Sequence, residues 1–315
     1  MNTGYAELIE RRISQWCGSL PASDLYAPMV YLLGLPAKRV RPALVLMACD
    51  LFEGAPERAL DEALAVELFH NFTLMHDDIM DASPLRRGMP TVHMKWDVNT
   101  AILSGDAMLV KAYQLMGRNA AAFHIFNRYA VEVCEGQQSD MAFESRTDVG
   151  IAEYTEMIRL KTAVLLNGAL RIGAVIAGAP EAQAERAGAF GEHMGLAFQL
   201  RDDLLDAYGD PSKTGKQQGG DLRNGKKTFL LIRGLERSAE ARSSVLREEL
   251  SKPPAERDVH RMLVVIEQLG VRAEAEAEIA RHDAMAHAAL DDVQAPEERK
   301  LPLRELAGRL LERAH

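Results

Sequence analysis

The sequence predicts an all-α protein that folds as one large domain. Ala, Leu, Glu, Arg and Met, which favour helices, dominate the chain, and runs of β-branched residues are scarce. Hydrophobic residues make up 47% of the 315 residues, which is ample for a core. No Pro-, Gly- or Ser-rich linker divides the chain, so we expect a single domain over residues 1–315.

Charge and cysteine content narrow the possible partners and location. The net charge of −9 argues against nucleic acid or an anionic membrane as a partner. An acidic protein with an anionic substrate needs metal ions and local basic residues to hold it. The three cysteines, Cys17, Cys49 and Cys134, show neither metal-site nor disulfide spacing, so we expect a reducing compartment and a cytoplasmic protein.

Neither a signal peptide nor a transmembrane segment is expected. The N-terminal stretch MNTGYAELIERR has no apolar signal core. The most apolar long window runs from Thr162 to Pro180, but Asn167 and Arg171 interrupt it. This window therefore predicts a buried helix.

The first half of the chain reads as helices joined by short connections. Residues 34–42 form a basic turn that holds Lys38, Arg39 and Arg41 between two prolines. Residues 59–81, 100–120 and 121–142 are expected to be core helices. The first helix, 3–17, is amphipathic and has an apolar face formed by Tyr5, Leu8, Ile9 and Ile13.

The second half is also expected to be helical. Lys161 and Thr162 are expected to begin a helix of small residues, in which Gly168, Gly173 and Gly178 indicate close helix packing. After Asp206, a basic loop rich in glycine and lysine suggests a mobile lid. Residues 228–315 return to helices, with breaks at Pro253-Pro254 and Pro296.

An aspartate motif, DDIMD, ends the helix predicted over 59–81. Asp77 and Asp81 are one turn apart on that helix and point the same way, so their charges repel. Mg²⁺ takes carboxylate oxygens and keeps positions open for phosphate oxygens. Arg86 and Arg87 follow, and arginine matches phosphate oxygens in a bidentate way. The alternative is a solvated acidic helix end followed by a basic turn.

The recurrence of the motif favours the metal site. The sequence QLRDDLLD places Asp202, Asp203 and Asp206 at the same spacing, again among apolar residues. Carboxylates on largely buried helices are rare unless they are paired or bound to metal. Two such triplets facing each other would make a cleft that binds several metal ions and a diphosphate.

These motifs, with the RRG after the first and the lysine-glycine loop after the second, resemble the trans-isoprenyl diphosphate synthases, or polyprenyl synthetases. The resemblance runs from about Lys38 to Lys227. It implies an isoprenoid synthase helical bundle around a central cleft, in a homodimer. It also implies three Mg²⁺ ions and the condensation of isopentenyl diphosphate with an allylic diphosphate.

The resemblance assigns roles to individual residues. The loop 34–42 is similar to the family's GGKRxRP loop, with Pro36 and Ala37 in place of the glycine pair. By the same resemblance, isopentenyl diphosphate is held by Lys38, Arg41, His70 and Arg87. The allylic diphosphate is bound by Arg86, Lys161, Thr162, Gln199, Lys216 and Lys226. Metal is held by Asp77, Asp81, Asp202, Asp203 and Asp206, and the catalytic set is Asp77, Asp78, Asp81, Asp202, Lys161 and Lys216.

The chemistry expected from these residues is ionisation of the allylic diphosphate, with its charge spread over metals and cations. The double bond of isopentenyl diphosphate attacks the allylic cation, and the departed diphosphate takes the proton. An apolar pocket must exclude water during this step. No Ser/His/Asp or Cys/His set is needed.

Residues before the first motif are expected to limit the length of the product. In the family, an aromatic residue five positions before the first aspartate and a small one four before it resemble the geranylgeranyl pattern. Phe72 and Thr73 occupy these positions, and Phe69 is a second candidate for the floor of the pocket. The expected product is geranylgeranyl diphosphate, with farnesyl diphosphate as the alternative.

Three other functions compete with this one. A class I terpene cyclase shares the first motif but usually has an Asn/Ser/Glu triplet in place of the second. A non-catalytic subunit of a heteromeric synthase tends to lose one motif, and both are intact here. His76 and Asp77 also spell the HD pair of metal-dependent phosphohydrolases, but no further His/Asp set supports that alternative.

Overall fold

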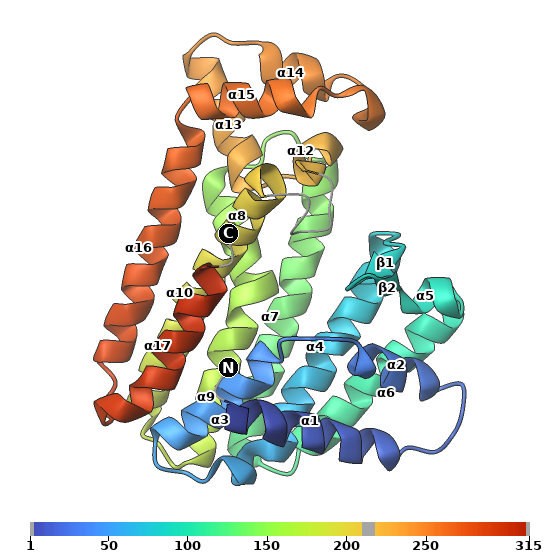
Figure 1. The fold of residues 1–315 in the computed structure, drawn as a ribbon, viewed down its shortest axis with the longest axis vertical. Coiled ribbons are helices and arrows are strands. Elements are labelled where there is room, and N and C mark those ends of the chain that lie inside the picture. The colour runs from blue at the N-terminus through green and yellow to red at the C-terminus, as the bar shows by residue number, and fades with distance from the viewer. Residues whose placement is uncertain (1–2, 210–217, 313–315) are drawn as a thin grey trace. The chain divides into compact units, whose positions relative to one another are not determined.

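The computed structural model describes residues 3–209 and 218–312. Apart from one two-stranded hairpin, the regular structure of these residues is helical, so the all-α prediction is confirmed (Figure 1). None of the helices in these ranges is long and apolar enough to cross a membrane.

Backbone contacts divide the chain into two compact units. The first unit contains Met1–Ala130, Gly168–Gly188 and Val293–Leu303, and the second contains Val131–Asn167, Ala189–Asp292 and Arg304–His315. Four of the five boundaries fall inside helices α7, α9, α10 and α17, and the fifth follows the end of α16. A single domain over the whole chain stays a prediction.

The first unit is built on helix α4, Leu60–Met80, which packs against α1, α3 and α6. Leu64, Leu68 and Met75 of α4 are buried in its core. The other elements are α1 (Thr3–Gly18), α2 (Ala27–Gly34), α3 (Val40–Leu51), η1 (Pro56–Ala59), β1 (Leu85–Arg86), β2 (Met89–Pro90), α5 (Val92–Lys95) and α6 (Val98–Met116).

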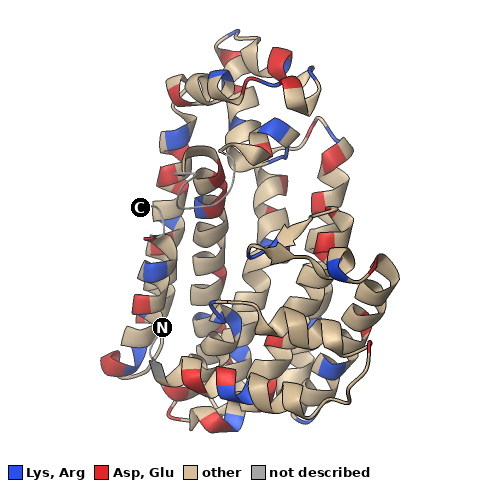
Figure 2. Ribbon diagram, turned by 45° about the vertical axis from the view of Figure 1, so that its right-hand side comes forward, with Lys and Arg blue, Asp and Glu red and all other residues tan. Residues whose placement is uncertain are grey.

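The second unit has its own apolar core, to which α8, α10, α13, α15 and α16 contribute. Its elements are α8 (Ile151–Ile158), η2 (Arg159–Ala163), α12 (Gly220–Asn224), α13 (Phe229–Glu240), α14 (Val245–Leu250), η3 (Pro254–Glu256), α15 (Val259–Gln268) and α16 (Val271–Asp291). The helices that contain the unit boundaries are α7 (Ala120–Ser145), α9 (Val164–Ile176), α10 (Glu181–Tyr208) and α17 (Glu297–Leu311). In Figure 2, acidic and basic residues are distributed over many of the helices.

The glycine predictions for α9 are partly confirmed. A Cβ added at Gly168 would lie 2.6 Å from the Tyr129 ring, and one at Gly173 would lie 2.0 Å from the Val45 carbonyl oxygen. Both glycines therefore allow close helix packing. Gly178 follows α9 at a φ of +84° with no neighbour within 4 Å, so close packing is the wrong reason there. It occupies a left-handed position, which glycine adopts without strain.

Three predicted boundaries need correction. The turn predicted over 34–42 ends at Arg39, because the residues from Val40 onward already belong to α3. Lys161 and Thr162 do not begin a helix: they lie in η2, a π-helical turn between α8 and α9. The predicted glycine- and lysine-rich loop contains the short helix α12 within its described part.

Candidate active site

The first aspartate motif lies at the C-terminal end of α4. Asp81 is the residue that caps the helix, and its backbone N–H donates to the Asp77 carbonyl oxygen over 2.9 Å. The carboxylates of Asp77 and Asp81 therefore stand one turn apart where the helix dipole is negative, so both the dipole and their mutual repulsion disfavour them. A bound divalent cation would reverse this penalty.

Asp78 is in a different environment from the two aspartates beside it. Its side chain is only 2% exposed, and the Arg86 guanidinium binds both carboxylate oxygens, with Nε 2.8 Å from Oδ2 and Nη2 2.6 Å from Oδ1. Burial raises the pKa of Asp78, and Arg86 opposes that rise. Asp78 thus anchors the β1–β2 hairpin to α4, and Arg86 is engaged by protein.

The hairpin turn presents Arg87. Arg87 and Gly88 form the two-residue turn, with φ of 54° and 77°. Hairpins favour such a turn, but a residue other than glycine, asparagine or aspartate adopts it only with strain, on the order of 1 kcal/mol. Arg87 makes no hydrogen bond or ion pair with any described residue. Strain and an available cation at one position are typical of a binding site.

Arg41 and His70 lie together in the first unit. Nη1 of Arg41 donates to Nε2 of His70 over 3.1 Å, so the imidazole is neutral with its proton on Nδ1. Burial, together with the charges of Arg41 and Arg87, holds the pKa of His70 well below its usual range. Burial also lowers the pKa of Arg41 to about 10. Within the described ranges, the buried Nε of Arg41 has no hydrogen-bond partner.

The carboxylate nearest to these cations is already paired. Glu67 is 2% exposed and accepts from Nη1 of Arg39 over 2.7 Å and from Nδ2 of Asn71 over 2.9 Å. Arg39 also binds Glu10 and the Leu33 carbonyl oxygen, and so has a structural role. Arg41 and Arg87 are left as an excess of positive charge, which an anion would neutralise. Lys38 lies exposed on the same loop.

The second aspartate motif is part of a buried hydrogen-bond chain. Thr162 Oγ1 donates to Gln199 Oε1 over 3.1 Å, and Gln199 Nε2 donates to Asp203 Oδ1 over 3.1 Å. Tyr154 Oη donates to Asp203 Oδ2 over 2.6 Å. Burial raises the pKa of Asp203 to about 7. Because both oxygens of Asp203 accept protein hydrogen bonds, it resembles Asp78 more than it resembles Asp77.

Lys161 is held by the π-helical turn η2. Its Nζ lies 2.6 Å from Asp140 Oδ2. A Cβ added at Gly136 would lie 2.3 Å from the backbone nitrogen of Lys161, and one at Gly195 would lie 2.7 Å from the Cα of Ala163. Two glycines therefore let α7 and α10 approach the turn closely. Since Lys161 is not at a helix N-terminus, the helix dipole gives no help to a phosphate there.

Among the remaining predicted residues of the second unit, Asp202 and Asp206 lie near the end of α10, and Lys226 follows α12. Asp202 is half-buried on this helix. Asp206 Oδ2 accepts the backbone N–H of Asp221 over 2.9 Å, so it also secures the start of α12. Lys226 is exposed, and its charge opposes the rise of the Asp203 pKa. Lys216 lies outside the described residues.

The predicted floor residues belong to an aromatic cluster. Phe69 is 1% exposed, and its ring centroid lies 5.3 Å from that of Phe126 on α7 and 5.8 Å from that of Phe72. Phe72 is half-buried and packs against His76, with centroids 4.7 Å apart. Thr73 Oγ1 donates to the His70 carbonyl oxygen over 2.8 Å. Phe126 thus adds a ring from another helix to this cluster.

His76 has a packing role. Its Nε2 lies 3.2 Å from the Ile102 carbonyl oxygen on α6, and a Cβ added at Gly105 would lie 2.3 Å from it. The His76 ring packs closely against α6 because Gly105 has no side chain there. This packing role gives no support to a metal-dependent phosphohydrolase.

The sequence did not identify three residues that shape the site: Glu67, Tyr154 and Gly136. Glu67 had a signal, because it and Asn71 form a polar pair one turn apart on an otherwise apolar stretch of α4. Tyr154 had none, because it meets Asp203 across a long sequence separation. For Asp140 the sequence did not decide between the cleft and solvent.

The residues fit magnesium with an open coordination shell. No group of three or more His, Cys, Asp or Glu side chains within 3–209 and 218–312 is arranged as a complete metal cage. Mg²⁺ usually takes one or two carboxylates and completes its shell with water and phosphate oxygens. Asp77 with Asp81 is such a pair.

Comparisons with known proteins agree with this chemistry. The family model described as polyprenyl synthetase matches residues 22–266. The short chain isoprenyl diphosphate synthase of Methanothermobacter thermautotrophicus is 35% identical over 99% of this chain and 97% of its own. A crystal structure of a geranylgeranyl pyrophosphate synthase has a TM-score of 0.93 at 40% identity and covers all of both chains. That of the Corynebacterium glutamicum geranylgeranyl pyrophosphate synthase, complexed with isoprenyl diphosphate and magnesium, has a TM-score of 0.87 at 30% identity, covering 98% of each chain.

Proposed function

Since the chain belongs to the polyprenyl synthetase family, we propose that it is a short-chain trans-prenyltransferase, which condenses isopentenyl diphosphate with an allylic diphosphate. The observation that carries this proposal is the repeated aspartate motif near the C-terminal ends of α4 and α10. In each motif the middle aspartate is held by protein groups, by Arg86 in one and by Tyr154 and Gln199 in the other.

We assign isopentenyl diphosphate to Lys38, Arg41, His70 and Arg87. Arg41 and Arg87 supply charge that protein carboxylates do not neutralise, and the neutral His70 can donate from Nδ1. A cluster of this kind binds an anion without the strong dependence on pH that a titrating histidine would bring.

We assign the allylic diphosphate to Lys161, Thr162, Gln199, Lys216 and Lys226, with Arg86 held close to the first motif by Asp78. Asp140 orients the Lys161 ammonium, and Gln199 connects Thr162 to Asp203. These groups place positive charge where the diphosphate accumulates negative charge as it leaves.

Asp77, Asp81 and Asp202 would hold Mg²⁺, with three ions as the family implies. The ions would supply Lewis-acid stabilisation of the departing diphosphate. We place Asp203 as a positioning residue and Asp206 as a carboxylate shared with the start of α12. The number of ions can be tested by titrating Mg²⁺ into the protein in the presence of an unreactive allylic diphosphate analogue and measuring how many ions bind per chain.

We propose geranylgeranyl diphosphate as the main product, with farnesyl diphosphate as the alternative. The support is the aromatic cluster of Phe69, Phe72 and Phe126, to which α4 and α7 contribute. A floor of this kind acts by steric exclusion, because a growing prenyl tail cannot displace buried rings without loss of packing.

We also propose that the enzyme is a cytoplasmic homodimer. Cys17, Cys49 and Cys134 are all free thiols, as expected in a reducing compartment. Helix α6 exposes a row of apolar side chains that a second copy could cover: Val98, Ile102, Leu103 and Val110.

The test is a condensation assay. Purified protein is incubated with Mg²⁺, farnesyl diphosphate and radiolabelled isopentenyl diphosphate, and the dephosphorylated products are separated by chromatography. Labelled geranylgeraniol is expected with Mg²⁺ and none with excess EDTA.

Other outcomes would identify the competing functions. Hydrocarbon formed without isopentenyl diphosphate would indicate a terpene cyclase. A correctly folded protein without product from any allylic starter would indicate a non-catalytic subunit. Full activity in EDTA would contradict the metal-dependent mechanism.

A further inference from the structure

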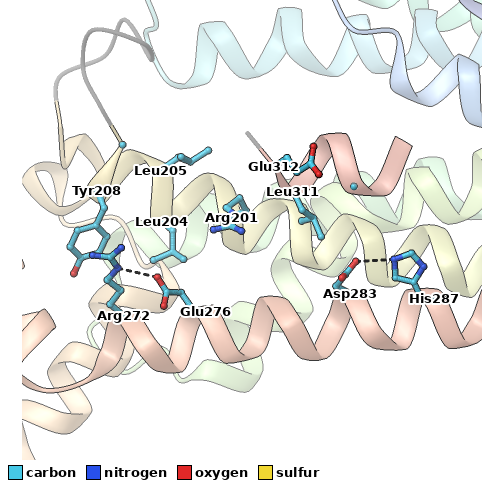
Figure 3. Close-up of a pocket in the computed structure, with 12 residues that line it drawn as sticks. Arg201, Leu204, Leu205, Tyr208, Arg272, Glu276, Asp283, His287, Leu311 and Glu312 are labelled. Carbon is cyan, nitrogen blue, oxygen red and sulfur yellow. Dashed lines mark hydrogen bonds and ion pairs between the residues drawn. The ribbon is translucent and has the colours of Figure 1, made fainter. Parts of the chain in front are cut away.

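A cavity of about 630 Å³ lies in the second unit, among α10, α16 and the end of α17 (Figure 3). Its volume is in the range of small-molecule sites, roughly 300–1,000 Å³. Arg201, Leu204 and Tyr208 line it from α10, and Arg272 and Asp283 line it from α16. None of the residues assigned to the two diphosphates lines it.

The cavity lies on the side of α10 opposite to the aspartates proposed to bind metal. Each residue turns an α-helix by about 100°, so Asp202 and Asp206 point within about 40° of each other. By the same geometry, Arg201, Leu204 and Tyr208 lie within about 60° of one another, on the other side of the helix. A ligand here would therefore contact the helix that carries the second motif without entering the proposed active site.

Arg201 is the unusual residue in this cavity. It makes no hydrogen bond and no ion pair with any other described residue, and its Nε is buried without a partner. The Arg201 side chain is partly exposed, but its buried Nε–H has lost hydration without gaining an acceptor, which costs on the order of 1–3 kcal/mol.

Several other charged groups around the cavity are matched. Arg272 Nε donates to Glu276 over 3.0 Å, and its guanidinium stacks on the Tyr208 ring at 4.8 Å. His287 Nε2 lies 3.5 Å from Asp283 (Figure 3). Three carboxylates, Glu276, Asp283 and Glu312, line the same cavity. None of them forms a hydrogen bond or an ion pair with Arg201.

The wall next to Arg201 is apolar. Leu204 and Leu205 follow it on α10, and Leu311 approaches from α17 (Figure 3). We propose that this cavity is a binding site for an anion that carries an apolar chain, with the anionic head on Arg201 and the chain against these leucines. The chemistry fits a phosphate monoester or a carboxylate on an alkyl or prenyl chain.

The probe is octyl phosphate, titrated calorimetrically into the full chain in EDTA, which weakens phosphate binding at the aspartates. We expect saturable binding that Arg201→Met weakens at least ~10-fold, because a hydrogen bond to a charged group is lost. Arg201→Lys should retain part of it. The matched control, Arg309→Met, removes an exposed arginine of α17 outside the cavity and should bind like the wild type.

Further arms separate the parts of the ligand. Inorganic phosphate and octanol should each bind more weakly than octyl phosphate at this site, because each lacks one half of the chemistry. If octanoate binds as tightly as octyl phosphate, the site accepts a carboxylate or a phosphate head. If only octyl phosphate binds, the site requires a phosphate head. Equal dissociation constants for the wild type and Arg201→Met would overturn the proposal.

Thermal unfolding gives an independent readout. Without ligand, Arg201→Met should melt at or above the wild-type temperature, because a buried N–H that has no acceptor is removed. Octyl phosphate should raise the melting temperature of the wild type more than that of Arg201→Met. Any shift that both proteins share would come from binding at other sites. A drop of several degrees in the ligand-free variant would show that Arg201 supports the fold, and would also overturn the proposal.

Discussion

Asp77 and Asp78 are sequence neighbours with opposite surroundings. Asp78 is buried and held by Arg86, so its charge is matched within the protein. Asp77 stands half-buried one turn from Asp81 at the negative end of the α4 dipole. At the scale of a single residue, Asp78 supports the structure through its close, buried contact with Arg86. Asp77 lies 3.9 Å from the same guanidinium and would be stabilised further by a bound cation.

This contrast predicts different effects of the same substitution. Asp77→Asn should lower kcat by a factor of about 10² or more, because charge stabilisation in the transition state is lost. In EDTA its free energy of unfolding should change little, because relief from the helix dipole and from Asp81 is offset by loss of the 3.9 Å ion pair with Arg86. Asp78→Asn should instead lower stability by about 2 kcal/mol, because it weakens a buried ion pair. Urea denaturation in EDTA and rates in Mg²⁺ measure both.

Asp81→Asn and Asp202→Asn should behave like Asp77→Asn. Equal loss of stability in Asp77→Asn and Asp78→Asn would show that the two aspartates are not separated in this way.

The diphosphate-binding cations predict a split in the Michaelis constants. Arg41→Met, Lys38→Ala and His70→Ala should chiefly raise KM for isopentenyl diphosphate, since the Arg41–His70 pair lies in the first unit. Lys161→Ala should act mainly through the allylic substrate. Losses of about tenfold each are expected for one charge-assisted hydrogen bond. Initial rates with each substrate varied in turn provide the measurement; equal changes in both constants would make the assignment wrong.

At the scale of elements, α4 connects the expected metal site to the chain-length floor. Phe69 is fully packed between Phe72 and Phe126, whereas Phe72 is half-buried. The two phenylalanines should therefore differ in what their removal costs.

Phe69→Ala should lower the free energy of unfolding by about 3–5 kcal/mol, and Phe72→Ala by clearly less. Either change, or the pair together, should lengthen the products without abolishing turnover, because the limit is steric. Chromatography of the dephosphorylated alcohols provides the readout, with Phe143→Ala, a buried phenylalanine of the second unit, as a packing control. An unchanged product distribution in the double variant would show that this wall does not set chain length.

Because Gly136 packs against the π-helical turn η2, its substitution should change the kinetics although Gly136 is not assigned to either substrate. Gly136→Ala would place a Cβ 2.3 Å from the Lys161 backbone nitrogen, so the turn must shift. The allylic KM should rise and kcat should fall by about tenfold or more, because a displaced cation loses its alignment. Gly4→Ala on α1, with nothing within 4 Å, is the matched control and should retain activity. Normal kinetics in Gly136→Ala would mean that η2 does not position Lys161.

Prediction from the sequence succeeded where the signal is local. The helix over 59–81, the amphipathic helix over 3–17 and the core helices near 100–142 follow from apolar periodicity, and the structure places them within a few residues. The repeated DDxxD motif was also sufficient to propose the chemistry. It could not separate Asp78 from Asp77, because that difference depends on Arg86 of the hairpin.

Nonlocal features escaped the sequence. The π-turn at Lys161 interrupts a continuous helix, and no residue type signals it. Lys161 was therefore placed at a helix start, whereas η2 is stabilised by glycines on α7 and α10. Arg201 received no role from the sequence, since an arginine whose buried Nε lacks an acceptor in a cavity can be recognised only in three dimensions.

At the scale of the whole molecule, each unit contributes a distinct part of the proposed chemistry. The first holds Asp77, Asp81 and the Arg41–His70 pair, and the second holds Asp202 and the Lys161–Asp140 pair. Since the diphosphate-binding charges are distributed in this way, activity should depend on the intact chain.

Assembly is the last property at this scale. Helix α6 exposes Val98, Ile102, Leu103 and Val110 at 45%, 42%, 61% and 54% of their surfaces. Clustered exposed apolar side chains of this kind usually mark a contact surface, and a symmetric dimer would bury the same row from both copies. We therefore expect a dimer in sedimentation velocity, with α6 at its centre.

Ile102→Glu combined with Val110→Glu should shift the sedimenting species to the monomer, because four carboxylates would be buried in each dimer without partners. Val264→Glu, on α15 of the second unit and 41% exposed, carries the same kind of change away from α6 and should leave the dimer intact. A wild-type monomer at micromolar concentration would exclude the homodimer. A double variant that stays dimeric would keep the assembly but move its interface away from α6.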